Sequence, residues 1–180
     1  MAVLKVGIAG FGVVGKRRKA CIDTHPALEV VAVCDRDVTP ADSDGGVQYF
    51  STYQKLLSLD LDVLFVCLSN DVASEVTIAG LKKGLHVFCE KPPGRNVQEI
   101  ENVVEVERLH QSQKLMYGFN HRYHDSIVDA LTIVQSGKYG RFFLRFTSNK
   151  PSAKNFLRRS SSILRSAPSP ATSNCSITIW

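Results

Sequence analysis

The stretch "GIAGFGVVG", residues 7–15, contains the spacing G-x-G-x-x-G at Gly10, Gly12 and Gly15. It follows a short apolar run at 3–9, typical of a buried parallel strand, and it opens a segment of helical character at 12–22. Asp35 stands at the end of the next apolar run, twenty residues after Gly15. The glycine spacing alone is weak evidence, but this context predicts a dinucleotide-binding site.

Each part of the glycine motif has an expected role at such a site. Gly10 allows the tight turn, Gly12 lets the backbone approach a pyrophosphate, and Gly15 permits close packing of helix on strand. The helix N-terminus offers free amide groups and a positive dipole end to the phosphates. A glycine turn without a ligand is the alternative. The cofactor contacts predicted here are Gly10, Phe11, Gly12, Val13, Val14 and Gly15.

The residues around Asp35 bear on the choice of cofactor. Asp35 is expected to accept hydrogen bonds from the ribose hydroxyls, which favours NAD. Arg36 could instead hold a 2′-phosphate or stack on the adenine, so NADP stays open as the second choice. The basic run from Lys16 to Lys19 is interpreted as a solvated helix face.

The rest of the chain up to about residue 137 alternates strand-like and helix-like runs. The strand-like runs are 28–35, 47–50, 62–68, 85–90 and 114–120. The helix-like runs are 52–58, 73–84, 96–113 and 125–137. In the helix at 96–113, the residues expected to face the sheet are Ile100, Val103, Val104 and either Val106 or Leu109. This alternation predicts an α/β fold, a Rossmann-type doubly wound parallel sheet.

Composition indicates a soluble globular protein with one full domain. The chain has 180 residues, 44% hydrophobic and 22% charged. Its net charge of +5 comes from the end of the chain, because seven Lys or Arg and no Asp or Glu follow from Arg141 onward. The Ser- and Arg-rich stretch at 149–180 predicts an irregular tail. No apolar run is long enough for a membrane span, and the start does not resemble a signal peptide.

Cysteine usage indicates a reducing compartment, and the expected location is the cytoplasm. No C-x-x-C pair occurs, so neither a zinc site nor any other metal site is expected. The four cysteines in apolar contexts, interpreted as buried free thiols, are Cys21, Cys34, Cys67 and Cys89.

Polar residues follow three of the expected strands, as Ser69-Asn70-Asp71, Glu90-Lys91-Pro92 and Asn120-His121-Arg122-Tyr123. The carboxyl ends of parallel strands share one edge of the sheet, where ligands of this fold bind. A ligand site therefore explains why these groups gather there. The structural alternative is that Glu90 pairs with Lys91 or another neighbour to close a loop.

On these segments the chain resembles the glucose–fructose oxidoreductase/inositol dehydrogenase (Gfo/Idh/MocA) family. The resemblance runs from about Leu4 to Phe146 and is carried by "GIAGFGVVG", "VVAVCDRD", "VLFVCLSND", "GLHVFCEKPPGRN" and "LMYGFNHRYH". It implies an NAD(P)-dependent oxidoreductase of sugars, cyclitols or related polyols. It also implies that Lys91 lies beside nicotinamide and substrate, orients the reacting hydroxyl and helps to move its proton, while Glu90 holds Lys91 in place. The further cofactor contacts that it implies are Ser69, Asn70, Glu90, Lys91, Asn120 and Arg122.

The chain departs from the family pattern in two places. The family often has Thr-Pro-Asn and a following histidine where this chain has Leu68-Ser69-Asn70-Asp71. The family also continues into a second α/β domain, which supplies a Gly-rich stretch, an Asp and an acid/base His. Here no glycine follows Gly140 and no histidine follows His124. That second domain is therefore expected to be essentially absent.

Three regions are expected from this comparison: a dinucleotide-binding domain at 1–124, a linking helix with the start of a substrate domain at 125–148, and the tail. Such a chain should bind cofactor but turn over a polyol or sugar weakly or not at all. A non-catalytic dinucleotide-binding or regulatory module is the alternative.

The basic tail raises the possibility of nucleic-acid binding. The tail lacks interleaved aromatic residues, however, and no specific nucleic acid is expected. Homo-oligomers are possible in the family but doubtful for this chain.

Overall fold

The structure is a computed structural model that describes residues 2–38 and 45–139. Contacts divide the chain between Ile127 and Val128, and the unit before that point contains the whole sheet. Its strands are β1 (Leu4–Ala9), β2 (Leu28–Cys34), β3 (Gln48–Phe50), β4 (Val63–Val66), β5 (His86–Cys89) and β6 (Leu115–Tyr117). The helices are α1 (Val13–Ile22), α2 (Tyr53–Leu57), α3 (Ala73–Lys82), α4 (Val97–Leu109) and α5 (Asp125–Gln135), with a 3₁₀ turn, η2 (Asn120–Tyr123).

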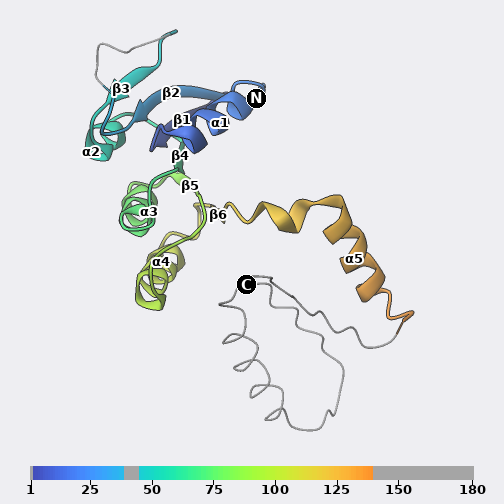
Figure 1. Ribbon diagram of the computed structural model, residues 1–180. Coiled ribbons are helices and arrows are strands. Elements are labelled where there is room, and N and C mark those ends of the chain that lie inside the picture. The colour runs from blue at the N-terminus through green and yellow to red at the C-terminus, as the bar shows by residue number, and fades with distance from the viewer. Residues whose placement is uncertain (1, 39–44, 140–180) are drawn as a thin grey trace, which may run out of the picture. The chain divides into compact units, whose positions relative to one another are not determined.

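The six strands form one sheet in the order β3-β2-β1-β4-β5-β6, and every neighbouring pair is parallel (Figure 1). The predicted parallel sheet is confirmed, and the order is that of a Rossmann fold. Strands β2 and β3 lie on one side of β1, and the later strands β4, β5 and β6 lie on its other side. The strand order therefore reverses between β1 and β4. That is the point where a crevice opens at the carboxyl ends of the strands.

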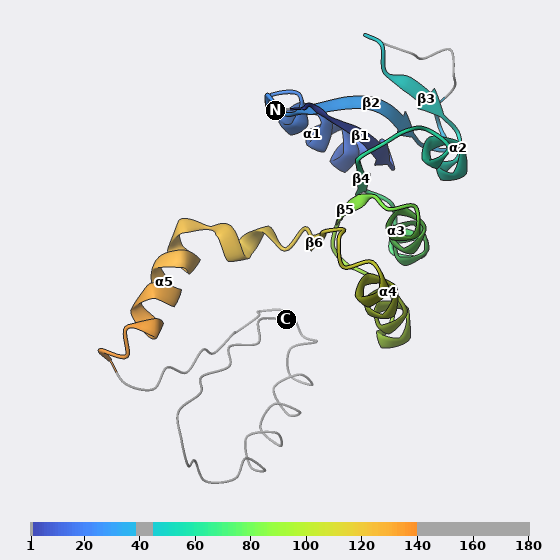
Figure 2. The same ribbon diagram turned by 180° about the vertical axis from the view of Figure 1, so that it is seen from behind.

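Helices cover both faces of the sheet, as a doubly wound fold requires. On one face α2 contacts β1 and β2, while α3 contacts β4 and β5 and packs on α4. Figures 1 and 2 show these three helices along the same side of the sheet. On the other face α1 contacts β1 and β2, and Val6, Ile8 and Ile22 form a buried cluster there. Burying each such side chain contributes roughly 1.5–3 kcal/mol before the entropic cost of ordering it.

Helix α4 ends earlier than its sequence pattern predicts. Its start is capped by Asn96, whose side-chain oxygen accepts from the amide of Glu99 at 3.0 Å. At the other end His110 leaves helical geometry, and its ring Nδ1 lies 2.8 Å from the carbonyl oxygen of Val106. Leu109 is consequently 81% exposed, and Val106 is the residue that packs on the core.

One of the four cysteine predictions is wrong. Cys34 and Cys89 are buried and Cys67 is half-buried, but Cys21 is exposed. The reason is helical geometry, because α1 turns Gly15 and Ile22 toward the sheet and Cys21 lies about 100° around the helix from Ile22. Burial raises the pKa of Cys34 to about 11 and that of Cys67 to about 12, so both thiols stay protonated at neutral pH.

Within residues 2–38 and 45–139, no helix has the length and apolar character that crossing a bilayer demands. The predicted tail at 149–180 and the part of the linking region from 140 onward lie outside the described residues.

Candidate active site

The three motif glycines are required for three different reasons. Gly10 has φ of +93°, and a Cβ there would lie 2.5 Å from the carbonyl oxygen of Cys67. Gly15 has ordinary helical geometry, but a Cβ would lie 2.0 Å from the carbonyl oxygen of Gly10. Both glycines are therefore explained by the protein itself, through the turn and through the contact of α1 with that turn.

Gly12 has no such explanation. Its φ of −72° suits any residue, and a Cβ added there would meet nothing within 4 Å. Gly12 is the N-cap of α1, where no side chain caps the helix, so the first-turn amides are available to a ligand. Val13 and Val14 follow with 70% and 44% of their surface exposed. The open space at Gly12 suits a pyrophosphate, which would take the amides' hydrogen bonds and the positive end of the helix dipole.

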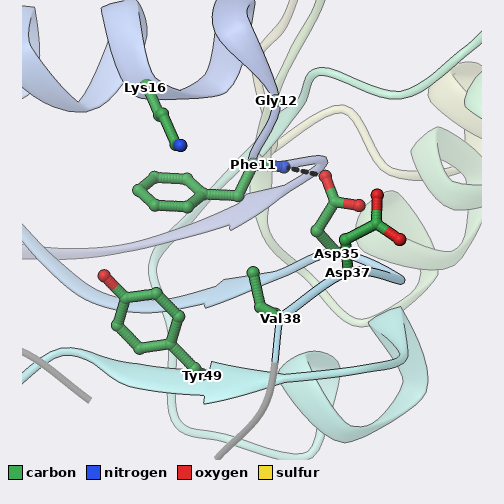
Figure 3. A pocket seen from close by; sticks show the side chains of 7 residues that line it. All are labelled: Phe11, Gly12, Lys16, Asp35, Asp37, Val38 and Tyr49. Carbon is green, nitrogen blue, oxygen red and sulfur yellow. Dashed lines mark hydrogen bonds between the residues drawn. The ribbon is translucent and has the colours of Figure 1, made fainter. Parts of the chain in front are cut away.

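Asp35 lies directly against the glycine turn. Its Oδ2 accepts a hydrogen bond of 2.6 Å from the backbone amide of Phe11 (Figure 3). The amide of Gly10 donates to the carbonyl of Cys34 at 2.8 Å, which fixes the turn to the end of β2. The carboxylate is thus held beside the N-terminus of α1, where the ribose of a dinucleotide is recognised in Rossmann folds.

A cavity of ≈ 490 Å³ opens between the glycine turn and β3. The Phe11 and Tyr49 rings, which both line it, pack edge to face with their centroids 5.8 Å apart. The Lys16 ammonium lies over the Phe11 ring (Figure 3). The side chains around it are those of Phe11, Lys16, Asp35, Asp37, Val38 and Tyr49, with Gly12 at the rim. Arg36 is exposed and outside this lining, so the charged side chains that residues 2–38 and 45–139 contribute to the cavity are two carboxylates and one lysine.

Sequence reasoning missed Asp37, Val38 and Tyr49, and it placed Lys16 on a solvated face. The position of Tyr49 follows from the pairing of β2 with β3, which sets Tyr49 beside Val33. The sequence feature that could have identified Asp37 as a cavity residue is its position, because it is an acidic residue only two positions after Asp35.

The residues after β4 form a tight turn at the same edge of the sheet. The amide of Cys67 donates to the carbonyl of Ala9 at 2.7 Å, which ties this turn to the end of β1. Ser69 and Asn70 are exposed, and the Ser69 carbonyl accepts from Val72 and Ala73 as α3 begins. The Ser69 hydroxyl also hydrogen-bonds the Asp71 carboxylate and lowers the pKa of that group.

Glu90 and Lys91 follow β5, the strand next to β4, and their environments differ. The Glu90 side chain is only 13% exposed and pairs with Arg18 of α1, a residue distant in sequence. The pairing with Lys91 that the structural alternative included is not formed, and the role of holding Lys91 in place that the resemblance implied for Glu90 is corrected, because Arg18 takes that carboxylate. Lys91 is exposed, and the ion pairs found within the described residues do not include it. The Lys91–Pro92 peptide bond is cis.

Asn120 and Arg122 lie on η2, just beyond β6, and both are exposed. The contacts found for this turn are local ones. The Arg122 guanidinium lies 5.7 Å from the centroid of the Tyr123 ring, and the rings of His121 and His124 stack at 5.0 Å. The predicted cofactor roles of Asn120 and Arg122 therefore stay predictions.

Comparisons with a family model and with curated sequences both match this chain to oxidoreductases. Residues 4–119 match the Gfo/Idh/MocA model, described as an oxidoreductase family with an NAD-binding Rossmann fold. Inositol 2-dehydrogenase of Salmonella typhimurium (strain LT2) is 32% identical over 147 residues, which cover 77% of this chain. D-Glucoside 3-dehydrogenase of Escherichia coli (strain K12) is 33% identical over 126 residues, or 67% of this chain.

Among solved structures, myo-inositol 2-dehydrogenase of Lactobacillus plantarum superimposes with a TM-score of 0.71 at 29% identity over 78% of this chain. Scyllo-inositol dehydrogenase of Lactobacillus casei, solved with NAD(H) and scyllo-inositol, has a TM-score of 0.69 at 29% identity over 77% of this chain. This chain spans less than half the length of these proteins. The matched part covers 43% of the Salmonella typhimurium enzyme and 36% of the Escherichia coli enzyme. It covers 43% of the chain in the Lactobacillus plantarum structure and 42% of the chain in the Lactobacillus casei structure.

Proposed function

The chain belongs to the Gfo/Idh/MocA oxidoreductase family, and on that premise we propose that it binds NAD and serves hydride transfer to or from a cyclitol, sugar or related polyol. One observation carries the proposal. Lys91 and the open glycine turn lie at the same edge of the sheet, at the carboxyl ends of β5 and β1, with only β4 between those strands. This placement supports a cofactor site at the glycine turn with Lys91 as the cation for the reacting oxygen at the same edge of the sheet.

The residues present fit a dinucleotide. The pyrophosphate would occupy the space at Gly12 and accept hydrogen bonds from the first amides of α1. Asp35 would accept from the ribose hydroxyls, and Phe11 and Tyr49 would wall the cavity beside them. Ser69, Asn70, Asn120 and Arg122 are proposed as the contacts further along the same edge. When bound, the nicotinamide ring supplies the acceptor or donor of the hydride.

Lys91 is proposed to act on the substrate oxygen. Oxidation of a secondary alcohol transfers a hydride from its carbon to the nicotinamide and releases the hydroxyl proton to solvent, and negative charge develops on the oxygen as that proton leaves. A lysine ammonium donates a hydrogen bond there and stabilises the charge as it develops. The exposure of Lys91 leaves its ammonium accessible to a substrate.

The experiment that tests the function is a turnover assay on the 180-residue chain with NAD and a panel of cyclitols and sugars, including myo-inositol, scyllo-inositol and a glucoside. We expect NADH to appear slowly and only when a polyol is present, because residues 4–119 contain the cofactor site and Lys91. The second candidate is a dinucleotide-binding module without catalysis, which is favoured by a cavity that lies at the glycine turn and whose described lining does not include Lys91. Saturable NADH binding without turnover on any member of the panel would select that candidate.

NAD is proposed over NADP because Asp35 and Asp37 both line the cavity and would repel a 2′-phosphate. Asp35→Asn keeps an oxygen that can accept from Phe11 but removes the charge. The ratio of the NAD affinity to the NADP affinity should fall by about tenfold, because one charge-assisted hydrogen bond contributes about that factor to binding. Calorimetric titration with both cofactors measures the ratio. Glu29→Ala, at an exposed position near the far end of β2, is the matched control, and an unchanged ratio in Asp35→Asn would reject Asp35 as its determinant.

A further inference from the structure

Arg18 differs from the rest of the basic run on α1. Its Nη2 lies 2.5 Å from Glu90 Oε1, and its Nε donates to the same oxygen at 2.6 Å. The Arg18 side chain is 32% exposed, so the interpretation of the whole run as a solvated face is wrong at this position. Lys19 pairs with Asp23 one turn along the helix, and Arg17 is exposed.

The Arg18 guanidinium is also held by aromatic packing. Its Cζ lies 5.0 Å from the centroid of the Phe88 ring, within the range of a cation–π contact. Phe88 in turn packs on Phe65 of the neighbouring strand, with centroids 5.0 Å apart. A planar guanidinium that stacks on a ring and binds a carboxylate is fixed in orientation, which a lysine ammonium cannot reproduce.

Glu90 is held by two further contacts, and the second of these involves a residue that is itself fixed to β5. Its amide donates to the carbonyl of Val66 at 2.9 Å, which holds its backbone to β4. Its Oε2 occupies space beside Gly118, where a Cβ would lie only 2.8 Å away. Gly118 itself donates to the carbonyl of Cys89 at 2.8 Å. The carboxylate therefore lies between α1 and Gly118, just beyond β6, while the backbone of Glu90 is held to β4. Among the residues that the structure describes, Arg18 is the cation paired with it.

This arrangement has a consequence for Lys91, the next residue in the chain. A mostly buried carboxylate without a cation is unfavourable, and it draws in whatever positive group can reach it. Lys91 is the adjacent candidate. With Arg18 in place the carboxylate is already satisfied, so the Lys91 ammonium is not needed there.

We propose that Arg18 is a positioning residue that neutralises Glu90 and thereby keeps the Lys91 ammonium free for the substrate oxygen. The substrate role of Lys91 rests on the function proposed above, but the diversion of Lys91 toward Glu90 does not. Removing Arg18 leaves Glu90 to capture Lys91. Removing the Glu90 charge as well releases Lys91 again, and this rescue distinguishes the proposal from a merely structural role for the ion pair.

The test compares wild type, Arg18→Met, Glu90→Gln and the double variant, with Arg17→Met as the matched control. Reductive methylation is quenched at intervals, and the modification of Lys91 is measured by mass spectrometry relative to Lys82, an exposed lysine on α3. We expect Arg18→Met to slow methylation of Lys91 by about three- to tenfold, because an ion-paired amine is less available. The double variant and Arg17→Met should react at the wild-type rate.

If thermal unfolding shows that Arg18→Met does not fold, Arg18→Lys is used in the methylation test. It keeps a cation for Glu90, so Lys91 should react at close to the wild-type rate. An unchanged Lys91 rate in folded Arg18→Met overturns the proposal, and so does a slow rate that persists in the double variant. In a chain that turns over, Arg18→Met should lower kcat about tenfold with little change in the KM for NAD. A chain without any turnover would count against the proposed function, while the methylation pattern would still decide the role of Arg18.

Discussion

Gly12→Val is expected to abolish NADH binding to this chain while leaving the fold intact. A Cβ at this position lies more than 4 Å from every heavy atom considered in the described residues, so we expect a valine to be accommodated in the folded protein. Its cost to folding is the loss of a favourable N-cap, about 0.5–1 kcal/mol. The same side chain fills the space in which a pyrophosphate would approach the first amides of α1. We expect affinity to fall by at least about a hundredfold, or ~2.7 kcal/mol.

Isothermal titration with NADH measures the loss, and thermal unfolding verifies the fold. Ala20→Val adds similar bulk at an exposed position of the same helix and should bind NADH normally. Gly15→Val is the opposite case, because its side chain would run into the carbonyl of Gly10 and should destabilise the protein itself. Normal NADH affinity in a folded Gly12→Val protein would contradict the proposed position of the pyrophosphate.

Lys91→Ala is expected to lower the rate of polyol oxidation by about a hundred- to ten-thousandfold, the usual contribution of one well-placed proton-transfer group. NADH affinity should change little, because the proposed contacts at the glycine turn and Asp35 lie on β1, α1 and the end of β2 and do not depend on Lys91. Steady-state kinetics and NADH titration on the same preparations separate the two effects.

Lys82→Ala is the matched control, since Lys82 is an exposed lysine on α3. A Lys91→Ala enzyme with unimpaired kcat would remove Lys91 from the chemistry and leave it at most a binding role.

The sheet could be predicted from sequence because its signals are local. Short apolar runs ending in glycine or polar residues identify parallel strands covered on both faces, and the six strands lie within the runs predicted for them. Helix ends and exposed faces were harder. Leu109 and Cys21 fit an apolar pattern, but the end of α4 at His110 and the angular position of Cys21 on α1 leave both exposed.

The site could be predicted only where a motif spans consecutive residues. Gly10, Gly12, Gly15 and Asp35 belong to one short pattern with a known mechanism, and Asp35 lies against the glycine turn. The role of Lys91 was implied by the family resemblance and stays a prediction. Arg18 and Glu90 are 72 positions apart, and no local pattern joins them. Tyr49 joins the cavity because β3 pairs with β2. Such partners follow from the packing of α1 on the sheet and from strand order, which periodicity does not encode.

The central claim is that a nicotinamide dinucleotide binds at the N-terminus of α1 and beside Asp35. The most direct measurement is a titration of the isotope-labelled chain with NADH, in which the chemical shift of each backbone amide is followed. We predict saturable changes concentrated at residues 10–16 and 35–38, reaching their limit near about one equivalent of NADH per chain, as one glycine motif implies. No saturable change, or changes confined to other parts of the described chain, would contradict the claim.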